Sequence, residues 1–254
     1  MTMTIAVAGK GGTGKTTFAA LLIKYIRSQN LGYILAIDGD PSTNLNLVLG
    51  MELPGTIGGI REDTLAQVST GRYDSSIPKA DFFEYRINEA LAEGDKIDLI
   101  AMGRPEGPGC YCAANSILRS VIDRLGNQYD FVVIDNEAGM EHISRQTTRD
   151  VDKLFVVTDM TMRGITAAGH IVGLIKELGT RVHETYLVIN RVNGDIPALM
   201  KQEIARLGLN LIGTLPQDRT IAEFDLIGKP LIEISEESPI YTAVAEIAAK
   251  AGIR

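Results

Sequence analysis

The sequence has little of what secreted, membrane-spanning and nucleic-acid-binding proteins use most. Its 254 residues include two cysteines, three histidines and no tryptophan. Two cysteines are too few for a secreted disulfide framework, so we expect a cytoplasmic protein. No apolar run approaches the roughly 20 residues that a membrane-spanning helix needs. The net charge of −7 argues against nucleic acid as the main partner. We therefore expect no membrane and no nucleic-acid partner.

The apolar residues that are present form a regular pattern. Short runs rich in Val, Ile and Leu alternate with segments of helical period, which is typical of repeated βαβ units. We predict an α/β fold with a mainly parallel sheet of about seven or eight strands, covered by helices on both faces. The expected strands are 4–8, 34–37, 97–102, 131–134, 154–157, 186–189 and 211–215. The expected helices are 16–28, 116–125, 165–178, 196–207 and 242–250.

One stretch, 51–94, is less regular, with scattered Gly, Pro and charge. An apolar helical segment, 82–91, lies at its end, so we interpret the stretch as an insertion within the same domain. No domain boundary stands out elsewhere. We predict a single domain over 1–254.

A glycine-rich loop follows the first expected strand and leads into the first expected helix. Its pattern, Gly9-(x)₄-Gly14-Lys15-Thr16, is that of a phosphate-binding P-loop. Glycines let backbone N–H groups turn toward phosphate, Lys15 supplies a charge to the β and γ oxygens, and the Thr16 hydroxyl reaches Mg²⁺. This predicts a P-loop NTPase that binds ATP or ADP with Mg²⁺. The expected nucleotide-binding residues are Gly9, Gly11, Gly12, Thr13, Gly14, Lys15, Thr16 and Thr17.

Acidic residues end two further strands. Asp38 and Asp40 follow the second strand, and Asp135 ends the strand 131–134, at the sheet edge where ligands bind in parallel folds. Asp135 is expected to support Mg²⁺. Asp38 is assigned either to Mg²⁺ or to supporting the loop. An ordinary turn with capping side chains is the alternative for the Asp38–Asp40 segment.

The second residue of the P-loop carries more information. With Lys10, the loop resembles the deviant P-loop ATPases, the class of MinD, ParA and the nitrogenase iron protein, whose signature is Lys-Gly-Gly-x-Gly-Lys-[Ser/Thr]. The resemblance implies that Lys10 reaches the nucleotide of a partner subunit, and that Asp40 polarises the attacking water. It further implies that Gly139 donates to the γ-phosphate, although Glu137 replaces the usual proline nearby. For the adenine base it implies contacts from Asn190, Pro216, Gln217 and Asp218.

The two cysteines form the pattern Cys110-Tyr111-Cys112, after the strand 97–102 and before a helical run. That placement puts them at the sheet edge of the P-loop and near a helix N-terminus, which favours thiolate. Two thiolates cannot complete a tetrahedral soft-metal site, but a symmetric dimer supplies four. Buried structural cysteines and a redox-sensing pair are alternatives. A disulfide between these two positions would be strained.

With the cysteine pattern included, the chain resembles CooC-type ATPases, which insert nickel into carbon monoxide dehydrogenase. This implies an ATP-driven homodimer that binds Ni²⁺ or Zn²⁺ at Cys110 and Cys112 and delivers it to a client nickel enzyme. One rival is an iron–sulfur reductase similar to the nitrogenase iron protein, whose ligating cysteines are far apart in sequence. Another is a MinD- or ParA-type positioning ATPase, which needs a basic amphipathic helix or a basic DNA-binding face.

Overall fold

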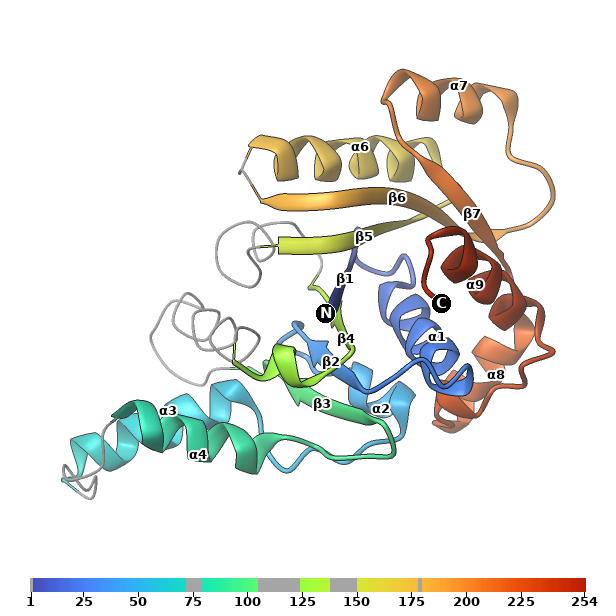
Figure 1. Ribbon diagram of the computed structural model, residues 1–254. Coiled ribbons are helices and arrows are strands. Elements are labelled where there is room, and N and C mark those ends of the chain that lie inside the picture. Colours follow the sequence, from blue (N-terminus) through green and yellow to red (C-terminus); the bar gives the residue numbers. More distant parts are fainter. Residues whose placement is uncertain (1, 72–78, 105–123, 138–149, 178–179) are drawn as a thin grey trace.

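The computed structural model describes residues 2–71, 79–104, 124–137, 150–177 and 180–254 (Figure 1). A seven-stranded sheet forms its centre, with strand order β3-β2-β4-β1-β5-β6-β7 and parallel pairing between all neighbours. The strands are β1 (Met3–Ala8), β2 (Ile34–Asp38), β3 (Ile97–Ala101), β4 (Phe131–Asp135), β5 (Asp150–Asp159), β6 (Arg181–Val192) and β7 (Leu211–Pro216). The predicted α/β fold with a parallel sheet is confirmed.

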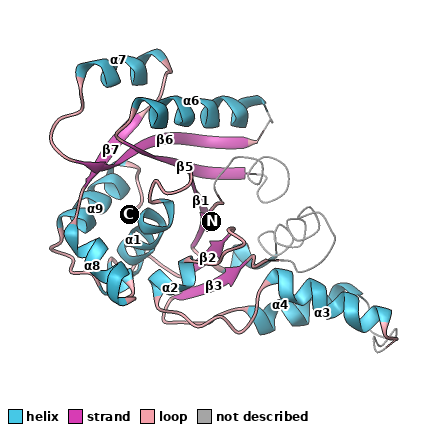
Figure 2. Ribbon diagram, turned by 180° about the vertical axis from the view of Figure 1, so that it is seen from behind, coloured by secondary structure: helices cyan, strands magenta, loops and turns pink. Residues whose placement is uncertain are grey.

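Helices cover both faces of the sheet, as Figures 1 and 2 show. Side chains alternate between the faces along each strand. Val7 and Val133 belong to the cluster under α1 and α9, whereas Ala6 and Val156 belong to the cluster under α6 and α7. The described α-helices are α1 (Lys15–Ser28), α2 (Leu45–Leu49), α3 (Ile57–Ser69), α4 (Lys79–Ala90), α6 (Met162–Glu177), α7 (Ala198–Arg206), α8 (Arg219–Ile227) and α9 (Pro239–Lys250).

The central strands β2 and β4 are buried along their whole length. Their near-continuous apolar sequences follow from this, because each strand packs on helices on both sides. Each of these strands ends in a carboxylate: Asp38 and Asp135 lie side by side as paired residues in the parallel register of β2 and β4. Burial of the strands therefore fixes where these two acids stand.

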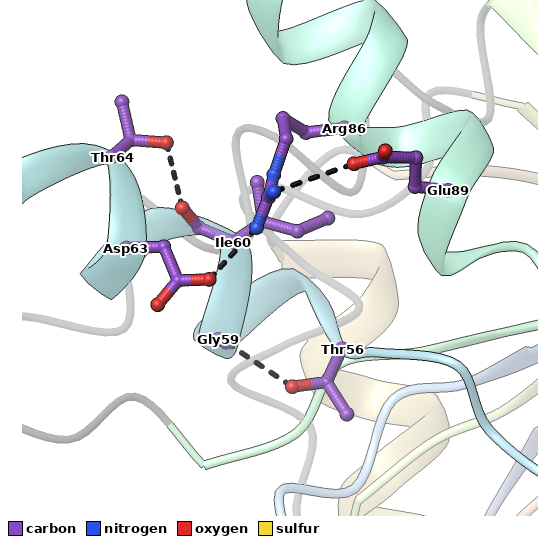
Figure 3. A network of polar contacts seen from close by, with 7 residues as sticks. All are labelled: Thr56, Gly59, Ile60, Asp63, Thr64, Arg86 and Glu89. Carbon is purple, nitrogen blue, oxygen red and sulfur yellow. Dashed lines mark hydrogen bonds and ion pairs between the residues drawn. The ribbon is translucent and has the colours of Figure 1, made fainter. Parts of the chain in front are cut away.

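The stretch 51–94 contains two helices rather than one. α3 and α4 lie side by side and extend away from the sheet (Figures 1 and 2). Arg86 of α4 bonds to Asp63 of α3 at 2.7 Å and to Glu89 at 3.3 Å, as Figure 3 shows. At the root of this α3–α4 hairpin, Ile57 and Ile60 pack in the same cluster as side chains from β2 and β3.

Other expected helices are found with shifted bounds, and one cannot be compared. The segment predicted over 116–125 lies almost entirely outside the described residues. The helices α2, α3 and α8 were not predicted. Among the helices that the structure describes, none is long and apolar enough to cross a membrane.

Candidate nucleotide site

The carboxyl ends of β1, β2 and β4 meet at one edge of the sheet. Val7 of β1 pairs with Asp135 of β4, which in turn pairs with Asp38 of β2. The loop 9–14 leaves β1 at this edge and α1 begins at Lys15, so the helix N-terminus faces the same space. Exposed N–H groups and the helix dipole favour an anion at such a position.

Two loop glycines stand where no side chain fits. A Cβ on Gly9, whose φ is +152°, would lie 2.1 Å from the carbonyl oxygen of Val157 in β5. A Cβ on Gly14, whose φ is +92°, would lie 2.1 Å from Nδ2 of Asn190 in β6. The loop is therefore packed closely against the two strands beside it, and glycine is required at both positions.

A side chain of the loop forms a hydrogen bond with the backbone of the same loop. The Thr13 hydroxyl, which is buried, donates to the carbonyl oxygen of Lys10 at 2.8 Å. Lys10, by contrast, is exposed, and so are Gly11 and Gly12. The outer part of the loop thus presents Lys10 to the surroundings while Thr13 anchors its inner part.

Lys15 is buried, and three carboxylates act electrostatically on its ammonium group. Its ammonium is 3.5 Å from the Lys10 carbonyl oxygen. Burial lowers the pKa of Lys15, and nearby carboxylates partly oppose this, in decreasing order Asp135, Asp40 and Glu137. A buried cation surrounded by acids is well placed to interact with phosphate oxygens that carry negative charge of their own.

Asp135 has one bonded and one free carboxylate oxygen. Thr16 donates to its Oδ2 at 2.5 Å, whereas its buried Oδ1 has no hydrogen-bond partner. Burial raises the pKa of Asp135 to about 7; the Thr16 hydrogen bond opposes this and the charge of Asp38 adds to it. An unpaired buried oxygen beside a hydroxyl fits a hard cation such as Mg²⁺, which prefers oxygen ligands. The residues present therefore fit the expected magnesium position.

Asp38 instead organises the loop that follows β2. Its Oδ1 accepts from the Asp40 N–H at 3.0 Å, and its Oδ2 accepts from Asn44 and Leu45 at 2.8 and 2.9 Å. Burial raises the pKa of Asp38, and these backbone hydrogen bonds oppose the shift. With both oxygens engaged, the geometry agrees with the loop-supporting interpretation of Asp38. A direct contact with Mg²⁺ stays a prediction.

The loop held by Asp38 carries Asp40 toward the P-loop. The Asp40 carboxylate accepts from the Ser42 N–H at 2.8 Å and acts electrostatically on both Lys15 and Asp135. The Gly39 N–H in turn donates to the Asp135 carbonyl oxygen at 2.9 Å. The structure therefore brings together the predicted residues Lys15, Asp40 and Asp135.

The expected adenine-contacting residues lie at the ends of β6 and β7. The Asn190 amide donates to the Thr13 carbonyl oxygen at 2.8 Å and accepts from the Arg191 N–H at 2.8 Å. It supports the P-loop in this conformation, a contact that the sequence did not reveal. Base reading by Asn190 stays a prediction.

Asp218 and its neighbours form the other half of the predicted base site. Pro216 ends β7, and the Gln217 N–H donates to the Val192 carbonyl oxygen at 3.2 Å. Asp218 caps α8 through Oδ1, which accepts from Thr220 at 2.9 Å, while its buried Oδ2 has no partner. A free buried acceptor fits a ligand that donates a hydrogen bond, such as an amino group.

One supporting residue was missed. Asn136, directly after Asp135, is buried, and its amide donates to the Val7 carbonyl oxygen at 2.9 Å, tying the end of β4 to β1. The sequence signal for this residue is its position: it is a polar residue immediately after a strand-end acid.

Cys110, Cys112 and Gly139 lie outside the described residues. Among the residues that the structure describes, no group of three or more His, Cys, Asp or Glu side chains is placed to hold a metal ion.

The fold and this edge of the sheet are those of a P-loop ATPase. The sequence matches the CobQ/CobB/MinD/ParA nucleotide binding domain over residues 4–231, and the chain belongs to that family. It is therefore a nucleotide-binding ATPase, as predicted from the P-loop.

Individual relatives agree with this membership. An uncharacterized ATP-binding protein of Methanocaldococcus jannaschii is 46% identical over 248 residues, covering 98% of each chain. The carbon monoxide dehydrogenase accessory protein CooC of Rhodospirillum rubrum is 29% identical over 245 residues, covering 92% of this chain and 90% of CooC. The septum site-determining protein MinD of Pyrococcus horikoshii, solved with Mg-ADP, has a TM-score of 0.71 at 24% identity, covering 98% of this chain and 95% of MinD.

Proposed function

We propose that the chain is a single-domain, ATP-dependent metallochaperone that uses nucleotide state to control a metal ion at Cys110 and Cys112. The observation that carries this is the Cys-Tyr-Cys pattern in a chain whose relatives include a carbon monoxide dehydrogenase accessory protein. Two thiolates from each of two subunits complete a tetrahedral site for Ni²⁺ or Zn²⁺. A nickel enzyme such as carbon monoxide dehydrogenase is the corresponding client.

The nucleotide half of this function rests on the described residues. Thr16 and the free oxygen of Asp135 would hold Mg²⁺, which neutralises charge on the phosphates when it is bound. Lys15 supplies a fixed positive charge to the β and γ oxygens. Its burial supports this role, because a charge acts more strongly where water is excluded.

Two further residues act on the hydrolysis step. Asp40, held by the loop that Asp38 organises, orients the attacking water. Lys10 is exposed on the outer part of the P-loop, where a second subunit can meet it. In a homodimer, each Lys10 stabilises charge on the γ-phosphate of the other subunit. ATP thereby brings the two cysteine pairs together, and hydrolysis releases them.

The test is metal stoichiometry on the full chain, measured by elemental analysis after gel filtration with Ni²⁺ or Zn²⁺. We expect one ion per two chains in the native protein and none in Cys110→Ser or Cys112→Ser. Both variants should still bind ATP, because neither cysteine belongs to the nucleotide site. One ion per chain, or retention of the ion in both variants, would contradict the proposal. A brown chromophore after anaerobic purification would instead favour the iron–sulfur reductase.

A MinD-type positioning ATPase is the second candidate, favoured by the similarity of nearly the whole fold to MinD. The two functions differ in what ATP promotes. Salt-sensitive binding to anionic vesicles or to DNA in the presence of ATP, with no stoichiometric metal, would favour positioning. The last helix, α9, has its apolar residues Ile240, Val244 and Ile247 buried in the core, so membrane binding through that face would require it to undock.

A further inference from the structure

A single buried residue joins the nucleotide site to the α3–α4 hairpin. Met102 follows β3, and its N–H donates to the carbonyl oxygen of Asp38 at 2.8 Å. Its own carbonyl oxygen accepts from the N–H of Gly58, in the first turn of α3, also at 2.8 Å. We propose that Met102 transmits nucleotide-dependent movement of the 38–45 loop to the α3–α4 hairpin, making the hairpin a nucleotide-responsive arm. The inference rests on the proposed function, in which Asp40 of this loop orients the attacking water beside the γ-phosphate.

The loop is built to move as one unit. The Asp38 side chain bonds to the N–H groups of Asp40, Asn44 and Leu45. A shift of Asp40 toward or away from phosphate therefore pulls on the residue whose carbonyl oxygen holds Met102. Because these bonds are buried or partly buried, breaking one without a substitute costs more than moving the group.

The hairpin is fastened to the same point by a second contact. Gly103, next to Met102, has a φ of +65° and packs against Thr56, the residue before α3. A Cβ at Gly103 would lie 2.2 Å from Oγ1 and 2.4 Å from Cβ of Thr56. Thr56 also caps the helix, accepting from the Gly59 N–H at 3.1 Å (Figure 3). The beginning of α3 thus follows any displacement of the 102–103 segment.

The two helices of the hairpin respond together because side chains cross-link them. Arg86 of α4 bonds to Asp63 of α3 and to Glu89 of its own helix (Figure 3). The hairpin extends away from the sheet in Figures 1 and 2, so a small rotation at its root gives a larger movement at its far end. Gly103 is seven residues before Cys110 in the sequence.

Gly58 allows the link to be cut with little other change. It is the second residue of α3, so its N–H has no partner within the helix and donates only to Met102. Gly58→Pro removes that donor at a position in the first helical turn, where proline is tolerated. Gly58→Ala is the matched control, since it also adds a Cβ but keeps the N–H.

The experiment is hydrogen exchange with mass spectrometry on the full chain without nucleotide, with ADP, and with a non-hydrolysable ATP analogue. In the native chain and in Gly58→Ala, we expect peptides of α3 and α4 to exchange at least threefold differently between the ADP and ATP-analogue states. In Gly58→Pro, the logarithm of the ratio of exchange rates between the two states should fall below about a third of its native value. The nucleotide affinity of the same samples should stay within about threefold of the native affinity.

Full retention of the difference in Gly58→Pro would overturn the inference, as would a native hairpin that exchanges identically in both nucleotide states. If Gly58→Pro does not fold, Gly103→Ala replaces it, with Gly208→Ala as control: Gly208 has a similar φ of +64° but no atom near its added Cβ. If the exchange difference of α3 and α4 is lost in Gly103→Ala but kept in Gly208→Ala, the proposed role of Met102 is supported. If the difference is lost in both variants, or kept in both, the proposal is contradicted. If the stoichiometry measurement finds no bound metal, the proposed metallochaperone function is wrong. The hydrogen-exchange outcomes do not depend on that result.

Discussion

The Thr16 hydroxyl donates a 2.5 Å hydrogen bond to Asp135, joining the first turn of α1 to the end of β4. The other oxygen of the same carboxylate is buried without a partner. This arrangement leaves Asp135 with a pKa of about 7, raised mainly by burial. The nucleotide site therefore carries an electrostatic cost in the absence of a cation, and a bound Mg²⁺ would relieve it.

Asp135→Asn should stabilise the nucleotide-free chain above neutral pH. Between the unfolded pKa near 4 and the folded pKa of about 7, the folded chain binds more protons, so the free energy of unfolding falls as pH rises. An amide removes this dependence. We expect a gain on the order of 1 to 3 kcal/mol at pH 8 and a much smaller gain at pH 5, measured by urea denaturation.

The same variant should lose most of its Mg-ATP affinity, because the free oxygen is replaced or neutralised. Asp225→Asn on the exposed surface of α8 is the control, with the same change of charge and no effect on either quantity. An equal gain in stability at pH 5 and pH 8 would show that Asp135 is ionised across the whole range, contrary to the burial argument.

The sequence predicted those parts of the fold whose signal is local. All seven strands were found because their central segments are rich in Val, Ile and Leu. In six of them those segments are buried, whereas β7 is only partly buried. The extra length of β5 and β6 was missed, because their first halves are polar. There, Arg181 pairs with Asp150 at 3.3 Å and Lys153 with Glu184, so ion pairs replace the apolar pattern.

The helices α3 and α8 were missed for different reasons. α8 is only nine residues long; Ile221 and Phe224 pack partly buried against the core, but Leu226 and Ile227 are exposed, so its apolar residues are not confined to the packed face. α3 has glycines at its second and third positions and buries the polar residue Thr64, so its apolar periodicity is weak. In the site, glycine spacing identified the P-loop. The partner of Asn190 was not predictable, because it depends on how separate strands align. The partners of Asp38 were not predictable, because they depend on the path of the loop that follows β2.

Asp38→Ala should destabilise the chain independently of magnesium. It leaves the N–H groups of Asp40, Asn44 and Leu45 without their acceptor; the bond to Leu45 is buried and the other two are partly buried. We expect the free energy of unfolding to fall by about 2 to 4 kcal/mol without nucleotide, measured by urea denaturation. Unchanged stability together with a selective loss of Mg²⁺ affinity would instead assign Asp38 to the metal.

Asn190→Ala separates support of the P-loop from reading of the base. If the amide acts through its hydrogen bond to Thr13, the affinities for ATP and GTP should fall together, by about 5- to 30-fold each, since a lost hydrogen bond costs about 1 to 2 kcal/mol. If it reads adenine, ATP affinity should fall while GTP affinity does not. Titration calorimetry with both nucleotides measures this, and Asp218→Asn offers the comparison at the unpartnered acceptor.

Lys10→Ala and Asp40→Ala together test whether the ATPase site is shared between subunits. Lys10 is exposed, whereas Asp40 acts on Lys15 of its own chain. We expect each variant alone to bind ATP and to hydrolyse it at least tenfold more slowly. In an equal mixture, half of the dimers pair one variant with the other, and one of their two sites has both residues. Activity should therefore return to about a quarter of the native rate.

The control for this mixture is Lys10→Ala combined with the double variant Lys10→Ala/Asp40→Ala, in which no dimer regains both residues at one site. Hydrolysis in that mixture should stay at the level of the single variants. Recovery should also depend on protein concentration, because it requires subunits to exchange and meet. If Lys10 acts on the nucleotide of its own chain, the first mixture recovers no more activity than the control, and the shared site is ruled out.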